Sequence, residues 1–505
     1  MNQLKAGAVL NYVAIILNMV IGLLYTPYML RMLGQAEYGL YSLAASIIAY
    51  LTVLDLGFGN AIIRYTAKFR AEGKIDEQKY MFGMFLVLYI GIGIIAVIAG
   101  AVLSLNVESI FSAKMTEYEV DRTRIMLWLM TFNLAFTFPM SIWGSIMTAY
   151  ERFTFPRIVS IVRSVLNPLV MVALLAIGYK ALAMVIVTTI FNVVTLLINY
   201  WYCKNKLKIE VRYGKFDFKF LKEVSVYSFW IFLNVIMDRI YWSTGQFVLG
   251  IYRGTVAIAI YAIAIQLQQM YMMFSTAISS VFLPKVTTMV ARGDNEKEIS
   301  DLFIRTGRIQ YIVMAFILTG YIIFGKNFIL LWAGANYENA YIISLLFFVP
   351  LTVPLIQNMG IIILQARNQM KFRSLLYIAI AIICFVISFP LGKNYGGIGC
   401  AIATASALTI GQIIVMNIYY YKSQHLDTIK FWKEIIKMTV IPSIFISTYF
   451  IFRNEANSFF SSTSNLIYGI LLFSILYIPL FWKTSMKQSE KELFAKPLKK
   501  VIKRN

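Results

Sequence analysis

Long apolar stretches, too long for the core of a water-soluble domain, recur along the whole sequence. Each runs for about 18 to 25 residues with few charges, which is the length that an α-helix needs to cross a bilayer. Of the 505 residues, 59% are hydrophobic and 14% are charged, so most of the apolar surface has no water-excluding core to enter. We therefore expect an all-α integral membrane protein.

The positions of these stretches predict about fourteen transmembrane helices, within a range of about twelve to fourteen because the thirteenth is short and one pair is hard to divide. The predicted spans lie at residues 7–30, 38–59, 80–105, 124–147, 158–177, 181–202, 224–249, 256–282, 309–331, 341–364, 374–391, 398–420, 438–452 and 465–482. An even number of spans puts both termini on the same side of the membrane.

Basic residues are distributed unevenly among the loops between the predicted spans. The N-terminal segment, every second loop and the C-terminal tail hold most of the 46 Lys and Arg residues. Because basic loops remain in the cytoplasm during insertion, this alternation predicts that both termini are cytoplasmic. The net charge of +22 thus reflects membrane topology and gives no reason to expect nucleic-acid binding.

The two halves of the chain resemble each other weakly at a nearly constant offset of about 218 residues. The matched segments are GLYSLAASI with AIYAIAIQL, AYERFTF with ARNQMKF, and NYWYCK with NIYYYK. Each pair occupies the same point of a six-helix cycle. Since six is even, we expect two six-helix bundles that run the same way through the membrane, as a parallel repeat.

This repeat predicts five parts of the chain: an N-terminal six-helix bundle (1–202), a basic cytoplasmic linker (203–222), a C-terminal six-helix bundle (223–420), two extra transmembrane helices (421–482) and a basic cytoplasmic tail (483–505). The linker and the tail interleave basic with apolar side chains. Such segments either lie on the anionic inner leaflet or are solvated topology signals.

Two adjacent charges, Asp238 and Arg239, fall near the middle of the seventh predicted span. Helical spacing puts Trp230, Asn234, Asp238 and Trp242 along one stripe with Tyr241 beside it, and turns Arg239 about 100° away. A charge inside a bilayer costs several kcal/mol and therefore has a partner, a wet cavity or a function. The two interpretations are a transport cavity and a packing ion pair with another helix.

Other polar groups inside predicted spans are less decisive. Arg163 lies close enough to a span end for its side chain to reach the interface, and Asp55 has a similar position. Polar side chains that share one helix face either hold helices together or line a wet path. Such stripes comprise Asn11, Asn18, Gly22 and Tyr25 on the first span, Asn133, Thr137, Ser141 and Ser145 on the fourth, and Gln266, Gln269, Thr276 and Ser280 on the eighth.

The sequence offers little chemistry for catalysis. It has one histidine and three cysteines, so we expect no metal site, no disulfide framework and no catalytic pair that uses histidine. The phosphate-binding pattern GxxxxGK[ST] is absent. We therefore expect a protein without a cofactor, and not an enzyme.

The segment TPYMLRMLGQAEYGLYSLAASIIAYLTVLDLGFGNAIIRY, from Thr26 to Tyr65, resembles the first hairpin of the polysaccharide-exporter flippases. These are the O-antigen and capsule repeat-unit translocases of the multidrug/oligosaccharidyl-lipid/polysaccharide superfamily. The later segments IYAIAIQL, FGKNFILLWAGANYENA, ILQARNQMKF and YGGIGCAIATA are similar too, so the resemblance covers nearly the whole chain.

The resemblance implies two bundles around a cavity that is lined by helices one, two, seven and eight and opens alternately to each side of a bacterial cell membrane. It implies a flippase, a secondary transporter coupled to H⁺ or Na⁺, that moves an undecaprenyl-diphosphate-linked oligosaccharide to the outer leaflet. Its partners would be that lipid-linked oligosaccharide, membrane lipids, a polysaccharide polymerase and chain-length machinery. Alternatives are a multidrug efflux antiporter, a lipid II flippase and, in another class, a membrane glycosyltransferase or polymerase.

The site residues follow from this hypothesis. Arg239 attracts the diphosphate, aromatic side chains contact the sugars, and Asp238, at a position that is acidic in many relatives, binds the coupling ion. The predicted substrate-binding residues are Arg239, Trp230, Tyr241, Trp242, Asn234, Gln266, Gln269, Asn18 and Arg163.

Overall fold

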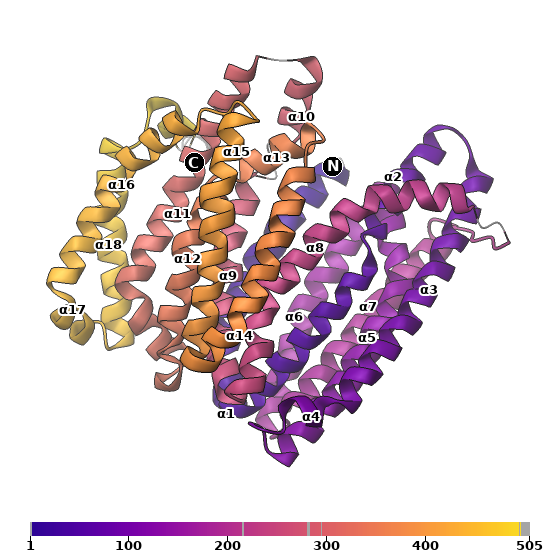
Figure 1. Ribbon diagram of the computed structural model, residues 1–505, viewed down its shortest axis with the longest axis horizontal. Coiled ribbons are helices and arrows are strands. Elements are labelled where there is room, and N and C mark those ends of the chain that lie inside the picture. Colours follow the sequence, from indigo (N-terminus) through magenta and orange to yellow (C-terminus); the bar gives the residue numbers. More distant parts are fainter. Residues whose placement is uncertain (1–2, 215–216, 280–282, 294, 494, 496–505) are drawn as a thin grey trace, which may run out of the picture. The chain divides into compact units, whose positions relative to one another are not determined.

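The computed structural model describes residues 3–214, 217–279, 283–293, 295–493 and 495, and it contains helices and no strand in these ranges (Figure 1). The elements in chain order are α1 (Gln3–Leu51), η1 (Thr52–Asp55), α2 (Phe58–Ala71), α3 (Ile75–Leu105), α4 (Val107–Phe111), α5 (Glu117–Ala149), α6 (Thr154–Ala176), α7 (Ala181–Asn205), α8 (Phe218–Tyr252), α9 (Thr255–Ser279), α10 (Leu283–Arg292), α11 (Glu296–Trp332), η2 (Ala335–Tyr337), α12 (Ala340–Ile356), α13 (Asn358–Ala366), α14 (Lys371–Leu408), η3 (Thr409–Val415), α15 (Met416–Lys422), α16 (Thr428–Ile451), α17 (Arg453–Phe459) and α18 (Thr463–Thr484). The predicted all-α membrane fold is confirmed.

Two of the long helices each hold one predicted span and the beginning of the next, joined at a glycine, and the second span continues past Leu51 or Leu408. α1 breaks at Gly34 (φ 76°) and α14 breaks at Gly396 (φ 60°), where glycine tolerates a positive φ that other residues rarely adopt. Ten helical stretches in the described ranges are long and apolar enough to cross a membrane, or eleven with the bent pair α12 and α13. Each of the two broken stretches holds two spans, and the 35-residue α8 lies at the seventh predicted span. With these three additions to the eleven, the described helices match the predicted number of about fourteen.

The chain forms two compact units: unit 1 is residues 1–262 and 374–404, and unit 2 is residues 263–373 and 405–505. In unit 1, α5 packs against both α3 and α7, and α1 packs against α6 and α8. Its core is aromatic, with Phe82, Phe85 and Tyr89 of α3 buried together with Phe138 and Trp143 of α5. The division of the chain at the linker 203–222 stays a prediction.

The linker is fastened to one end of unit 1. Lys79 of α3 pairs with Glu210 at 2.6 Å, and Arg212 pairs with Asp76 at 2.9 Å. The backbone N–H of Arg212 also donates to the carbonyl of Lys79 at 3.1 Å. The neighbouring Lys79 ammonium lowers the pKa of the Glu210 carboxyl. The linker therefore has protein partners in addition to any contact with lipid.

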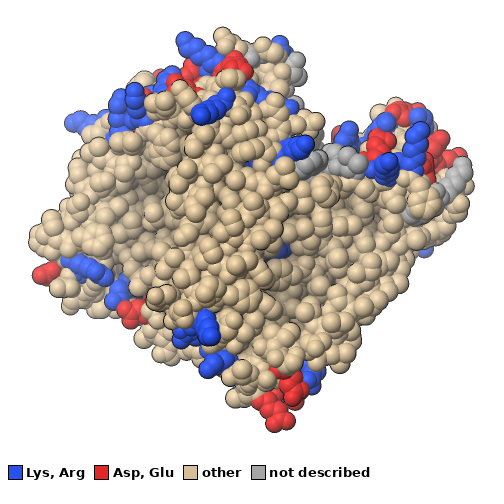
Figure 2. Space-filling model, in the orientation of Figure 1, with Lys and Arg blue, Asp and Glu red and all other residues tan. Residues whose placement is uncertain are grey.

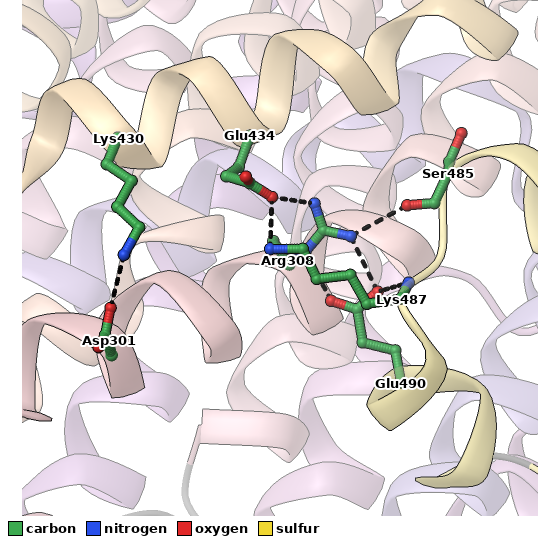
Figure 3. A network of polar contacts seen from close by, with 7 residues as sticks. All are labelled: Asp301, Arg308, Lys430, Glu434, Ser485, Lys487 and Glu490. Carbon is green, nitrogen blue, oxygen red and sulfur yellow. Dashed lines mark hydrogen bonds and ion pairs between the residues drawn. The ribbon is translucent and has the colours of Figure 1, made fainter.

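Unit 2 is held together by a buried ion-pair network (Figure 3). Arg308 of α11 donates from Nε to Glu490 at 2.6 Å, from Nη1 to Glu434 of α16 at 2.7 Å and from Nη2 to the carbonyl of Ser485 at 2.9 Å. Lys487 pairs with the same Glu434 at 2.7 Å. Arg308 is 3% exposed and Glu490 is 2% exposed. The beginning of the basic tail thus packs into unit 2.

Charged side chains are concentrated near helix ends. On the face that Figure 2 shows, the Lys, Arg, Asp and Glu side chains gather at the ends of the helices in each unit, with a broad uncharged surface between them. Many large apolar side chains of α3, α7, α14 and α18 are exposed. An uncharged, apolar surface of this kind is what contact with lipid tails requires.

Replacing Arg308 with alanine should strongly destabilise the protein, because it leaves Glu490 buried without its cationic partner, while Glu434 keeps only Lys487. Removing one member of a buried ion pair costs about 3–5 kcal/mol. The matched control is Lys430→Ala, which removes the half-exposed Lys430–Asp301 pair (2.8 Å) seen beside the network in Figure 3. Its expected cost is about 0–1 kcal/mol.

Thermal unfolding of the detergent-purified variants measures the difference. Arg308→Ala should unfold at a clearly lower temperature than both Lys430→Ala and the wild type. Equal midpoints for the two variants would show that the network contributes no more than an exposed pair.

Candidate functional site

Helix α8 carries six of the predicted site residues in unit 1. Asp238 is exposed, Arg239 and Trp242 are half-buried, and Tyr241 is buried. The two adjacent charges therefore have different surroundings, as helical spacing predicts. The Nε of Arg239 is buried and donates no hydrogen bond to any residue that the structure describes.

Neighbouring helices fix the position of α8 by hydrogen bonds inside unit 1. Asn234 donates from Nδ2 to Ser374 Oγ of α14 at 3.4 Å. Tyr50 of α1 bonds the hydroxyl of Thr244 at 2.8 Å. Asn234 is thus brought to a helix contact, while the side chain of Trp230 lies outside the described residues.

The remaining predicted residues of α1 and α9 are not gathered around α8 within one unit. Asn18 belongs to unit 1 and is exposed on α1. Gln266 is half-buried and Gln269 is exposed, and both belong to the part of α9 in unit 2. Their convergence with α8 on one substrate stays a prediction.

Arg163 of α6 is part of a polar network inside unit 1. Its Nη1 donates to Asn192 Oδ1 of α7 at 2.8 Å. Asn192 in turn donates from Nδ2 to Asn133 Oδ1 at 2.7 Å and to Thr137 Oγ1 at 2.8 Å, both on α5. We call Arg163, Asn192, Asn133 and Thr137 the amide network. In this network the guanidinium of Arg163, which lies within a candidate span, is bound by a neutral amide.

The sequence indicated two parts of the amide network and missed the residue that joins them. Asn133 and Thr137 were expected to share a face of the fourth span, and Arg163 was expected near a span end. Asn192 lies on α7, where Thr188, Asn192, Thr195 and Asn199 follow one another at helical spacing and share one face. This polar stripe, of the same kind as the stripes on the first, fourth and eighth spans, is the signal that could have pointed to it.

Asp55 has a structural partner. It ends the short helix η1, where Leu56 (φ 52°) and Gly57 (φ 73°) separate η1 from α2. The hydroxyl of Tyr89 donates to Asp55 Oδ1 at 2.9 Å. This bond satisfies a carboxylate oxygen beside the break and agrees with a packing role for Asp55.

A second polar cluster, not expected from the sequence, lies in unit 2 around Ser275 of α9. Asn358 and Gln310 donate to Ser275 Oγ at 2.9 and 3.1 Å, and this hydroxyl donates to the carbonyl of Leu355 at 2.7 Å. The described residues contain no group of three His, Cys, Asp or Glu that could hold a metal. The amides and hydroxyls of these two clusters are groups that suit binding by hydrogen bonds.

Replacing Asn192 with alanine should destabilise unit 1, since it removes the amide that links Arg163 to Asn133 and Thr137 of α5. Leaving such partly buried donors and acceptors unpaired costs about 1–3 kcal/mol. Thr195→Ala is the control on the same helix, because that hydroxyl bonds the carbonyl of Phe191 one turn away. Thermal unfolding should separate the two variants, and equal midpoints would mean that the amide network does not stabilise the fold.

Comparison with known proteins gives consistent results. The family described as polysaccharide biosynthesis protein matches residues 4–290. A Shigella flexneri protein described as an O-antigen transporter is 20% identical over 412 residues, covering 78% of this chain and 92% of its own. A protein of Haloferax volcanii described as probable flippase AglR is 23% identical over 437 residues, covering 83% of both chains.

Solved structures show the same fold at low identity. The lipid II flippase MurJ in an inward closed conformation has a TM-score of 0.71 at 16% identity, over 97% of this chain and 99% of that one. An inward-facing multidrug MATE transporter of the MOP superfamily has a TM-score of 0.65 at 12% identity, over 82% and 99%. Because the family match covers more than half of the sequence, this multi-pass membrane chain belongs to the polysaccharide biosynthesis protein family.

Proposed function

We propose that this protein is a flippase that moves an undecaprenyl-diphosphate-linked oligosaccharide from the cytoplasmic to the outer leaflet of a bacterial cell membrane, by alternating access, for surface polysaccharide biosynthesis. Membership of the family supports this proposal. So do the relatives described as an O-antigen transporter and a flippase, which this chain matches over about four fifths of its length.

The observation that carries the proposal is the presence of two arginines inside helices of unit 1 without a described carboxylate partner. No ion pair joins Arg163 or Arg239 to an acidic side chain in the described ranges, and the Nε of Arg239 is buried without an acceptor. A guanidinium binds phosphate oxygens in a bidentate manner, and it does so most strongly where water is scarce. A diphosphate is therefore the chemical group that these side chains suit best.

The other predicted residues receive roles that fit their chemistry. Trp230, Tyr241 and Trp242 contact the sugars, since aromatic rings present flat apolar faces with polar edges. Tyr241 is buried in this structure, so it reaches the substrate only after a conformational change. Exposed Asp238 binds the coupling proton or Na⁺.

Amide side chains complete the proposed binding site. Asn18, Gln266 and Gln269 are at least partly exposed and can exchange hydrogen bonds with sugar hydroxyls, while Asn234 lies at the contact with Ser374. Because Gln266 and Gln269 belong to unit 2, the proposal requires that both units contribute to the site during transport.

We also propose that both termini are cytoplasmic. Two basic loops meet at one end of unit 1, where Arg70 lies 4.0 Å from the ring centroid of Tyr150 and donates to the carbonyl of Ala149 at 3.0 Å. The linker with its basic residues is fastened to the neighbouring end of α3. Gathering basic loops at one end agrees with the rule that positive loops stay inside.

Arg239→Ala should lower export of surface polysaccharide by about tenfold or more, because a hydrogen bond to a charged group contributes about 1.5–3 kcal/mol. The substitution Asp238→Asn should leave substrate binding intact and remove the dependence of transport on the coupling ion. The control is Arg157→Ala, an exposed arginine at the start of α6. Surface polysaccharide is measured in cells with equal amounts of each protein.

Wild-type export by both variants would contradict the proposed roles. Two further phenotypes separate the alternatives. A deletion strain that gains only drug sensitivity points to a multidrug antiporter. Loss of viability on depletion points to a lipid II flippase.

Orientation has its own test by cysteine labelling in intact cells. The native cysteines Cys203, Cys384 and Cys400 are buried, so the background should be low. A cysteine in place of exposed Lys180 should react with a membrane-impermeant reagent from outside, and one in place of exposed Lys204 should not. The reverse pattern would place the termini outside the cell.

A further inference from the structure

A pocket lies at the end of unit 1 away from the linker, where three helices of the bundle reach the edge of the candidate spans. It is lined by Glu37 of α1, Tyr118 and Arg122 of α5, and Tyr179 and Lys180 of the turn between α6 and α7. α5, α6 and α7 are all candidate spans that begin or end next to these residues. Tyrosines and basic side chains at span ends are typical of the membrane interface.

The rest of the pocket wall is aliphatic. Leu174 comes from the last turns of α6, and Leu182, Ile186 and Val187 come from the first turns of α7. Ile186 is 40% exposed on a helix that presents many apolar side chains to its surroundings. One pocket thus combines a charged, aromatic part at the interface with an apolar part that continues along the membrane-spanning surface.

Both carboxylate oxygens of Glu37, in the pocket wall, accept hydrogen bonds from the protein itself. Tyr118 donates its hydroxyl to Glu37 Oε1 at 3.0 Å, and the backbone N–H of Ala181 donates to Glu37 Oε2 at 3.2 Å. Glu37 is 7% exposed. It therefore fixes the start of α7 against α1 and α5, and the pocket is preformed.

The two cations of the pocket, Arg122 and Lys180, lack the ion pairs that the nearby Arg124 of α5 makes. Neither Arg122 nor Lys180 has a carboxylate within ion-pair distance in the described residues, and Arg122 stacks on the ring of Tyr118 at 5.1 Å. Arg124, two residues further along α5, pairs with Glu108 at 3.3 Å and with Asp121 at 3.1 Å. The pocket thus keeps uncompensated positive charge although acidic residues are close in sequence.

We propose that this pocket binds an anionic phospholipid of the surrounding leaflet, with its phosphate at Arg122 and Lys180 and an acyl chain along Leu182 and Ile186. The two cations match a head group with net negative charge, and the engaged Glu37 leaves no carboxylate for the ammonium of a zwitterionic lipid. The bound lipid joins α5 to the turn between α6 and α7. This inference needs only the membrane location of the chain and is independent of the proposed substrate.

The experiment is native mass spectrometry of the full-length protein in detergent, titrated with phosphatidylglycerol and, separately, with phosphatidylcholine. The wild type should retain phosphatidylglycerol in preference to phosphatidylcholine. The double variant Arg122→Ala/Lys180→Ala should bind phosphatidylglycerol about tenfold more weakly, because two attractive charges are removed near the head group. Arg124→Ala is the matched control and should bind as the wild type does.

A second variant keeps the test decisive if the double variant fails to fold. Ile186→Trp fills the apolar part of the pocket while leaving both cations in place, and it should also weaken phosphatidylglycerol binding. Equal phosphatidylglycerol affinity for the wild type and for a folded variant of either kind would overturn the proposal. So would displacement of phosphatidylglycerol by a lower concentration of undecaprenyl phosphate, which would make the pocket a substrate site.

Discussion

The constraint on which this structure depends is that backbone N–H and C=O groups find no water inside a bilayer. A segment that crosses the membrane must satisfy these groups within itself, and the α-helix is the structure that does so with one segment. The apolar stretches of this chain therefore become helices, and the breaks occur where the backbone can turn sharply. Gly34 and Gly396 interrupt α1 and α14 with positive φ angles, and each break divides one helix into two spans.

The same shortage of water determines how polar side chains are arranged. Arg308 is bound by Glu434 and Glu490, so a nearly neutral cluster holds α11, α16 and the segment after α18 together. Arg163 is bound by the amide of Asn192 and has no described acidic partner. The charge of Arg308 is thus balanced by two carboxylates, whereas the charge of Arg163 is not. Arg163 is therefore the better candidate for binding an anionic substrate.

The sequence predicted the local features well because they depend on spacing along the chain. Hydropathy located the helices, including the two halves of α1 and α14, and helical periodicity placed Asp238 and Arg239 on different faces of α8. Contacts between distant segments could not be predicted from the sequence. Arg308 and Glu490 are 182 residues apart, and the tail that contains Glu490 was expected either to lie on the inner leaflet or to be solvated. The burial of Tyr241 depends on packing against other helices, which periodicity does not describe.

Transport itself is tested most directly with the purified protein in liposomes. A labelled undecaprenyl-diphosphate oligosaccharide is placed in one leaflet, and its appearance in the other is followed with an enzyme that modifies the exposed sugar and cannot cross the bilayer. The proposed function predicts transfer much faster than in protein-free liposomes, with most of that rate lost in the Arg239→Ala variant. Transfer at the protein-free rate by a correctly folded wild-type protein would contradict it.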